Sequence, residues 1–239
     1  MENALYTTLN RQSGLMAEMR AVANNIANLS TTGFRKEGVI FAEHVADLGR
    51  EEPSLSMAAA EGRLVSLAQG TLVKTGGTFD LAIEGEGFFQ IDTPEGPRLT
   101  RAGAFTSSAE GELVTADGHR LLDLGGAPVF VPVDAGTVAV APDGTVSADG
   151  APVAQIGLFQ PVDPTGLLHS GGTRFEVRGG IEPIETGVVF QGFLENSNVN
   201  PVTEIARMIE VQRAYEMGQG FLDSEDQRIR AVIQTLGRS

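Results

Sequence analysis

The sequence predicts an α+β protein in which two helices at the chain ends enclose a central all-β domain. At both ends apolar residues recur every three or four positions, whereas the interior consists of short alternating runs broken by glycine. The 239 residues include 30 glycines, two tyrosines and no tryptophan, which is typical of a β domain rich in tight turns. An N-terminal helix, an extended connector, the β domain, and a junction with a C-terminal helix are expected at 1–28, 29–70, 71–190 and 191–239.

The N-terminal helix is predicted over residues 4–28, where the spacing of the seam positions alternates between four and three. This is the heptad spacing of a coiled coil. One seam position is polar, and a polar seam residue can fix the register and the number of partners. The seam consists of Leu5, Leu9, Gln12, Met16, Met19, Ala23 and Ile26.

The C-terminal helix is predicted over residues 201–236, because its start is marked by three residues. Asn200 can cap it, Pro201 suits a first helical position that needs no amide hydrogen, and Glu204 lies in the first turn. Its length would be roughly 54 Å against roughly 37 Å for the first helix, so it extends beyond its partner or meets another chain. The same heptad spacing joins Ile205, Met208, Gln212, Tyr215, Gln219, Leu222, Asp226, Ile229, Ile233 and Leu236.

A lone pair of these helices is expected to be only marginally stable, because burial of one apolar seam does not offset the conformational entropy lost in ordering the helices. We therefore predict that both are ordered best when they pack against helices of other copies. Gln12, Gln212, Gln219 and Asp226 leave two interpretations open. They either specify register on the seam or face water on a partly buried helix.

Residues 29–70 show no sustained period, which predicts an extended connector. Beyond it, Asp-Gly pairs begin at positions 117, 143 and 149 and indicate tight turns, because glycine adopts positive φ at little cost. The segments 109–118 and 141–150 read AEGELVTADG and APDGTVSADG. Their similarity fits either a repeated hairpin design or shared turn chemistry.

The formal net charge is −14, and the acidic residues concentrate in the middle of the chain. Residues 70–190 hold 6 Lys and Arg against 16 Asp and Glu, a net charge of −10, whereas both ends are nearly neutral. Because nucleic acids bind basic surfaces, we expect no nucleic-acid partner. The near-neutral ends can approach one another, or other copies, without strong repulsion.

The sequence contains no cysteine, which excludes disulfides, thiolate metal sites and a cysteine nucleophile. Glu2, Arg11, Glu18 and Arg20 interrupt the first 25 residues, so we expect no cleaved signal peptide. No apolar stretch is long enough for direct insertion into a membrane.

No catalytic, metal-binding or cofactor-binding constellation is predicted. His44, His119 and His169 lack metal-ligand spacing, and the glycines of GEGFF at 85–89 lead into a strand without the third glycine of a dinucleotide loop. The Asp-Gly turns lack the ligand series of a calcium loop, and no GxSxG is present. We therefore expect no cofactor.

Asparagines cluster where the first helix ends and again where the second begins. Asparagine amides can bond the carbonyls freed at a helix end, Gly33 permits a sharp exit, and Phe34 can anchor it. Two antiparallel helices that share a junction would require such clusters at both places. The predicted junction motif consists of Asn24, Asn25, Asn28, Gly33, Phe34, Asn196, Asn198 and Asn200.

Three sequence blocks, in this order, resemble the flagellar axial proteins, the rod and hook family. The first is NNIANLSTTGF at 24–34. The second is TGGTFDLAIEGEGFFQI at 75–91 with LTRAGAFTSSAEGELVTADGHRLL at 99–122, and the third is GFLENSNVNPVTEIARMIEVQRAYE at 192–216. Together they cover more than a third of the chain, and their motifs are specific.

The resemblance implies a structural subunit of the bacterial flagellar basal body, not an enzyme. It implies export through the flagellar type III apparatus and helical assembly in the periplasm with copies of itself and other rod proteins. The heptad spacing suggests that the terminal helices form an inner coiled-coil-like layer while the β domain faces outward. The assembly residues would be Leu5, Leu9, Met16, Met19, Ala23, Ile26, Ile205, Met208, Tyr215, Leu222, Ile229, Ile233 and Leu236.

Two other classes of protein stay open. A soluble enzyme could use the β domain, with the helices as a dimerisation handle, because carboxylates distant in sequence can pair in space. That reading predicts a concave pocket with converging polar groups. An adhesin or filament protein outside the flagellum would be secreted even without the flagellar export gate.

Overall fold

The computed structural model describes residues 2–46, 55–184 and 186–236. Within those ranges, the backbone alone is described for residues 2–6, 41–46, 55–61, 232 and 235. The chain forms two compact units. The helical unit comes from residues 1–27, 37–63 and 200–239, and the β unit from 28–36 and 64–199. Two helices and a β-rich centre confirm the α+β class.

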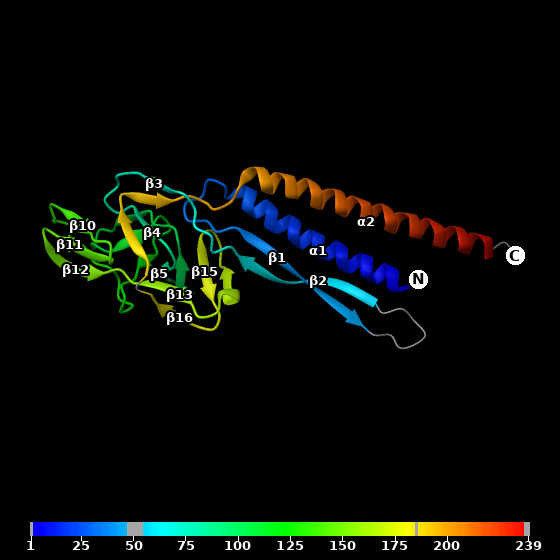
Figure 1. Cartoon of the computed structure of the whole chain (residues 1–239), viewed down its shortest axis with the longest axis horizontal. Coiled ribbons are helices and arrows are strands. Elements are labelled where there is room, and N and C mark those ends of the chain that lie inside the picture. The colour runs from blue at the N-terminus through cyan, green and yellow to red at the C-terminus, as the bar shows by residue number, and fades with distance from the viewer. Residues whose placement is uncertain (1, 47–54, 185, 237–239) are drawn as a thin grey trace. The chain divides into compact units, whose positions relative to one another are not determined.

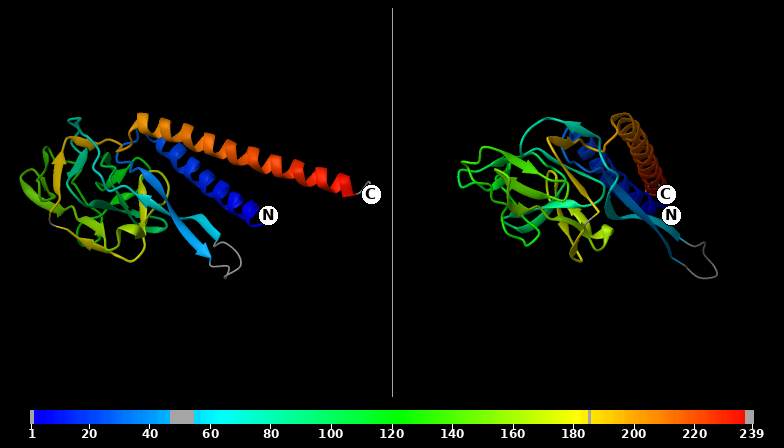
Figure 2. Two further views of the ribbon diagram at one scale, coloured as in Figure 1. Left: turned by 45° about the vertical axis from the view of Figure 1, so that its right-hand side comes forward. Right: turned by 60° about the vertical axis from the view of Figure 1, so that its left-hand side comes forward.

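The helical unit contains the two terminal helices, α1 (Glu2–Ala27) and α2 (Pro201–Leu236). The bounds of α2 are those predicted, whereas α1 begins two residues earlier and ends one residue earlier than the predicted range 4–28. The helices lie side by side and run in opposite directions (Figures 1 and 2). No described helix is both long enough and apolar enough to span a membrane.

Asn200 caps α2, as the sequence predicts. Its Oδ1 accepts hydrogen bonds from the amides of Val202 at 3.0 Å and Thr203 at 3.2 Å. These amides have no partner within the helix, so the side chain supplies one. Glu204 lies in the first turn, where a carboxylate interacts favourably with the helix dipole.

Two long strands occupy much of the segment that the sequence predicts as an extended connector. β1 (Glu37–Ala46) pairs with β2 (Leu55–Val65) in a two-stranded sheet (Figure 2). Within the predicted connector, 29–70, the structure therefore shows a paired two-stranded sheet that the sequence did not indicate. Strand pairing depends on a partner elsewhere in the chain, which a local apolar period does not reveal.

In the described part of the β unit there are one nine-stranded sheet and three smaller sheets, and the pairings described are antiparallel. The nine strands are β5 (Phe88–Thr93), β6 (Gly96–Thr100), β7 (Phe105–Ser107), β8 (Leu113–Thr115), β9 (Arg120–Leu121), β13 (Leu158–Pro161), β14 (Leu167–His169), β15 (Arg174–Val177) and β16 (Ile181–Pro183). A three-stranded sheet consists of β10 (Val138–Val140), β11 (Thr145–Ala148) and β12 (Ala151–Gln155). In the two remaining sheets, β17 (Val188–Gln191) pairs with β4 (Leu81–Glu84), and β18 (Phe193–Glu195) pairs with β3 (Leu72–Lys74). A 3-10 turn covers Pro164–Gly166.

β5 contributes to both hydrophobic clusters of the β unit. Phe89 and Ile91 belong to the larger cluster, and Phe88 belongs to the smaller one. This follows from the period of two along a strand, which sends adjacent side chains to opposite faces. β5 is therefore buried on both faces and lies at the centre of the unit.

The Asp-Gly turns form as predicted, and Gly118, Gly144 and Gly150 all have positive φ. The two similar segments share one local arrangement, in which a strand is followed by an Asp-Gly turn. The strand of segment 109–118 belongs to the nine-stranded sheet, and that of 141–150 to the three-stranded sheet. Within the described parts of the β unit, the two segments therefore share their local strand-and-turn structure but belong to different sheets.

Candidate assembly surfaces

Asn25 links α1, β1 and α2 of the helical unit through hydrogen bonds. Its side chain is fully buried, and its Nδ2 donates to the carbonyl of Glu37 at 2.8 Å and to the Glu204 carboxylate at 2.9 Å. Its Oδ1 accepts from the amide of Glu37 at 2.9 Å. The sequence suggests that this amide bonds carbonyls at the end of its own helix. Instead it joins α1 to β1 and α2.

Two further contacts set the antiparallel register of the helices. Arg207 Nε donates to Glu18 Oε1 at 2.6 Å, and this bond raises the pKa of Arg207. Closer to the α1 N-terminus, Gln12 Nε2 donates to the carbonyl of Tyr215 at 2.9 Å. Gly218 makes room for that amide, because a Cβ at this position would lie 2.2 Å from Gln12 Nε2. Gln12 is buried and lies between the helices.

The face of α2 that packs within the chain is displaced by one residue from the predicted seam. Glu204 and Val211 are buried and Gly218 is half-buried, seven residues apart. The neighbouring seam positions Gln212 and Gln219 are exposed, as is Asp226. A count of apolar residues misses this face because two of its positions are Glu and Gly.

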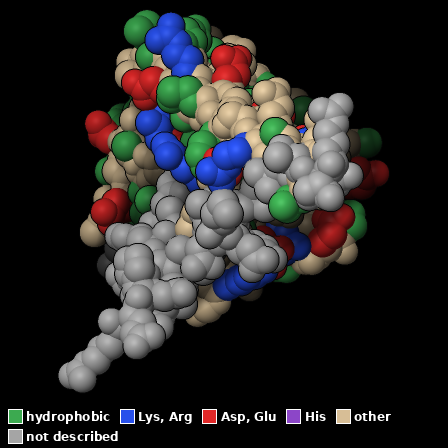
Figure 3. Space-filling model, turned by 90° about the vertical axis from the view of Figure 1, so that its right-hand side faces the viewer, with side chains coloured by type: hydrophobic (Ala, Val, Ile, Leu, Met, Phe, Trp, Pro, Cys, Tyr) green, Lys and Arg blue, Asp and Glu red, His purple; other side chains and the backbone are tan. Residues whose placement is uncertain are grey.

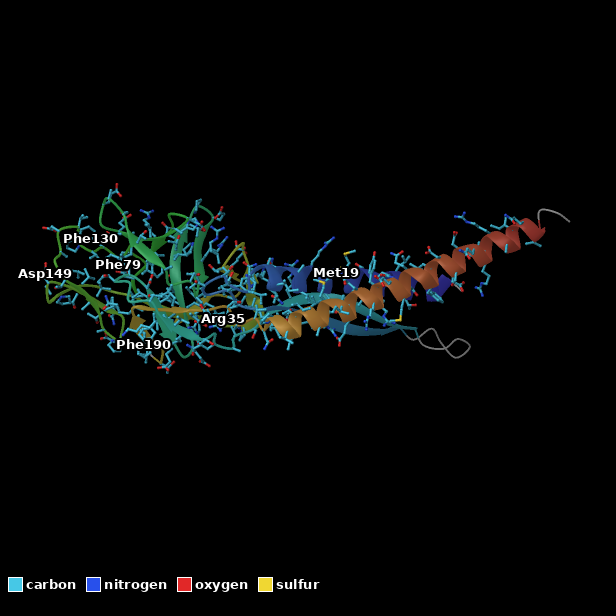
Figure 4. The ribbon with its side chains drawn as sticks, turned by 90° about the horizontal axis from the view of Figure 1, so that it is seen from above. Met19, Arg35, Phe79, Phe130, Asp149 and Phe190 are labelled. Atoms are coloured by element: carbon cyan, nitrogen blue, oxygen red, sulfur yellow. The ribbon has the colours of Figure 1, made fainter. Side chains whose placement is uncertain are left out.

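The predicted assembly residues of α1 whose side chains are described are exposed or half-buried. Ala21 and Val22 are buried, whereas Leu9 is 47% exposed. Leu5 lies outside the residues whose side chains are described. Of the others, Ala23 is exposed, and Met16, Met19 (labelled in Figure 4) and Ile26 are half-buried.

On α2 the predicted residues divide into half-buried and exposed positions. Met208, Tyr215 and Leu222 are half-buried. The exposed positions are Ile205 at 50%, Ile229 at 49%, Ile233 at 63% and Leu236 at 70%. Figure 3 shows hydrophobic side chains among basic and acidic ones on the face that it displays.

Within the β unit, the chain after α1 meets the chain before α2. Gly33 has φ +71° and donates its amide to the carbonyl of Glu195 at 2.7 Å. Phe34 is buried and stacks on the ring of His169 at 5.2 Å. Asn198 Oδ1 accepts from the amide of Lys36 at 2.6 Å. The two segments therefore form one hydrogen-bonded joint.

The other junction asparagines make local contacts. Asn28 Oδ1 accepts from the Thr31 hydroxyl at 3.0 Å, half-buried at the turn after α1. Asn196 is exposed, and its backbone N–H donates to the carbonyl of Thr71 at 2.9 Å. In the helical unit, half-buried Asn24 donates to the Glu37 carboxylate at 3.3 Å.

A buried ion cluster supports the joint, and the sequence reasoning missed it. Glu195 lies 3.1 Å from Arg35 Nη2 and 3.3 Å from Arg101 Nη1, and all three side chains are almost completely buried. Burial lowers the pKa of Arg101 to about 10 and also lowers the pKa of Arg35, while Glu195 opposes both changes. Because the three residues are distant in sequence, no local motif predicts the cluster.

A surface hollow of the β unit lies beside the buried ion cluster. The hollow beside Arg35 and Arg101 has a volume of about 310 Å³, and its other polar side chains are Glu86, Gln160 and Glu182. Both arginines are held by backbone carbonyls as well as by Glu195. Among the residues that the structure describes, no three His, Cys, Asp or Glu side chains are grouped as metal ligands.

Exposed apolar faces on a pair of long terminal helices are typical of a structural subunit that assembles with other chains. Comparison with sequence models of known families supports this class. Residues 5–35 match the family described as "Flagella basal body rod protein". Residues 82–148 match "Flagellar hook protein FlgE/F/G D1 domain", and residues 191–235 match "Flagellar basal body rod FlgEFG protein C-terminal".

Individual relatives match over the whole chain. The protein of Caulobacter vibrioides named "Flagellar basal-body rod protein FlgF" is 38% identical over 100% of this chain and 99% of its own. The FlgF protein of Rhizobium meliloti is 36% identical over 100% of both chains, and the FlgG protein of Bacillus subtilis is 30% identical over 98% of both. The chain therefore belongs to the flagellar basal-body rod protein family. It is a structural subunit of the basal body, not an enzyme.

Proposed function

We propose that the chain is a FlgF-type subunit that joins the rod, the axial drive shaft, through its two terminal helices. The observation that carries this proposal is the exposure of Leu9, Ile205, Ile229 and Ile233 on helices that already pack against each other. Intrachain packing leaves these four side chains on the exposed side of their helices. The exposed faces are thus free to form a coiled-coil-like layer with neighbouring copies and other rod proteins.

The predicted seam residues Leu5, Met16, Met19, Ala23, Ile26, Met208, Tyr215, Leu222 and Leu236 belong to the same proposal. The Asn25 network and the Glu195 cluster act differently, because they hold each unit in shape. Loss of a seam residue should impair incorporation, and loss of Asn25 or Glu195 should impair folding.

The FlgF type is favoured over the distal-rod type FlgG by the chain length near 240 and by the start MENALYTTLNRQ. The relatives named FlgF are 36–38% identical to this chain. A complementation experiment tests the assignment. The gene should restore swimming to cells that lack FlgF and not to cells that lack FlgG, and the opposite result would assign it to FlgG.

Export is part of the proposal. A rod subunit has to reach the periplasmic space, and we propose that this chain passes through the flagellar type III apparatus without cleavage of a signal peptide. Deletion of the export gate should retain the chain inside the cell with its N-terminus intact. Secretion without the gate would favour an adhesin or another extracellular filament.

The assembly role is tested by replacing Met16 and Met208 with Asp. Each replacement introduces a charge on a seam, and we expect the variant to be absent from isolated basal bodies while its β unit unfolds at the wild-type temperature. Val162→Asp, at a 59% exposed position of the β unit, is the matched control and should be incorporated. Normal swimming of cells whose only copy is the double variant would refute the proposal.

A further inference from the structure

The helical unit contains an open hollow between α1 and α2, near the end of the pair that holds the α1 N-terminus. Its volume is about 330 Å³. Met217 is 70% exposed and Phe221 is 42% exposed at its edge. Its walls are apolar or small over most of their extent, and they comprise Thr8, Arg11, Gln12, Leu15, Ala214, Met217, Gly218 and Phe221.

The last turns of α2 extend beyond α1. Gln12 lies opposite Tyr215, so Glu2, ten residues earlier in α1, lies opposite a position near residue 225. The remaining residues of α2 span roughly 16 Å at 1.5 Å per residue. We call residues 226–236 the overhang.

The overhang continues the apolar face of α2, and no helix among the described residues covers it. Leu222, Ile229 and Leu236 are seven residues apart and share one heptad position. Leu222 is half-buried, whereas Ile229 and Leu236 are 49% and 70% exposed. The face is therefore covered where α1 accompanies it and exposed where α1 has ended.

The overhang cannot reach the hollow of its own chain. Met217 and Ile233 are 16 residues apart on one continuous helix, which corresponds to roughly 24 Å. A straight helix keeps these positions apart. If an overhang fills the hollow, that overhang must therefore belong to a second copy.

We propose that the overhang of one copy packs into the α1–α2 hollow of a second copy, which rests on the proposed assembly function. The overhang and the hollow are different surfaces, so each copy can insert its overhang into one neighbour and accept that of another. Such a contact is heterologous and forms an open series, as a helical rod requires.

Charge and area agree with this occupant. In the overhang, Arg230 pairs with Asp226 at 2.8 Å, and Arg228 pairs with Glu225 at 2.6 Å in the turn just before it. The ion pairs neutralise this end and leave its aliphatic side chains to make the contact. A few side chains bury much less than the roughly 1,000 Å² expected of a stable interface. The contact therefore forms in the polymer and leaves the free chain monomeric.

The absence of cysteine from the chain permits a direct test. Cells produce two differently tagged versions, one with Met217→Cys and one with Ile233→Cys, and isolated basal bodies are treated with a short bismaleimide. We expect a dimer that carries both tags. The matched control replaces Met217→Cys by Val202→Cys, a 75% exposed position of the same helix roughly 22 Å away. The yield with the control should be at least tenfold lower.

The outcomes separate this inference from the function on which it rests. If both tags are present in the basal bodies and the dimer is no more abundant than with Val202→Cys, the overhang does not occupy the hollow. A link from Ile233→Cys only to itself or to a different rod protein also overturns the inference. If neither tagged chain is present in basal bodies, the assembly function itself fails, and the inference fails with it.

Discussion

Gly218 and Gln12 provide a sharp test of how the two terminal helices are registered. Glycine inside a helix is less favourable than alanine by about 1 kcal/mol, so Gly→Ala normally stabilises a helix. At Gly218 the added Cβ would lie 2.2 Å from Gln12 Nε2 and displace it from the Tyr215 carbonyl. Loss of that hydrogen bond from a buried amide costs about 1–2 kcal/mol. The gain and the loss nearly cancel.

Gly220 is the matched control, because it lies two residues away in the same helix with nothing within 4 Å of its Cβ position. Gly220→Ala should stabilise the helical unit by about 1 kcal/mol, while Gly218→Ala should give no gain. In a Gln12→Ala background, Gly218→Ala should recover the full gain, which gives a coupling of about 1–2 kcal/mol.

The assay is urea unfolding of the purified chain, followed by helical circular dichroism at 222 nm. This signal reports mainly on α1 and α2, which hold almost all of the helix among the described residues. Equal stabilisation by Gly218→Ala and Gly220→Ala in the wild-type background would refute the register argument. So would a coupling near zero in the double-mutant cycle.

Three further predictions concern the β unit and the free chain. Glu195→Gln leaves two buried arginines without their counter-charge and should destabilise the β unit by about 3–5 kcal/mol in calorimetry. Glu176→Gln, at an ion pair whose Glu176 side chain is 46% exposed, should cost less than about 1 kcal/mol. Equal costs would contradict the cluster's role. Hydrogen bonds, above all from the Thr137 amide, lower the pKa of Asp149, so its contribution is complete above the unfolded pKa near 3.9 and is lost as the pH falls through the lower folded value. Asp149→Asn should therefore lower the melting temperature at pH 7, and this effect should shrink as the pH falls through the lowered folded pKa. An effect of Asp149→Asn that does not change with pH would show that the charge is irrelevant. Protease digestion of the monomer should cut mainly outside residues 70–190, and a fully resistant monomer would count against helices that need neighbours for order.

Locally determined features were predicted from the sequence. Asn200, Pro201 and Glu204 define the start of α2 through contacts within one turn, and the structure reproduces them. The Asp-Gly turns at 117 and 143 depend on glycine at positive φ and also form as predicted. These features need no information from distant parts of the chain.

Features that depend on distant partners were missed. The sequence predicts that the Asn25 side chain bonds carbonyls at the end of its own helix. Its partners are instead Glu37 and Glu204, and Glu204 is 179 residues away. The pairing of β1 with β2 and the meeting of Glu195 with its two arginines are likewise set by tertiary contacts. The heptad count found both helices, yet it could not determine which face of each packs within the chain.

The central claim is that the terminal helices, not the β unit, make the joints of the rod. Electron cryo-microscopy of isolated basal bodies, at a resolution that shows side chains, tests it most directly. We predict that Leu9, Ile205 and Ile233, all at least 47% exposed in the single chain, are buried against helices of neighbouring subunits. Helices that point into solvent while the β units make all contacts between subunits would contradict the account.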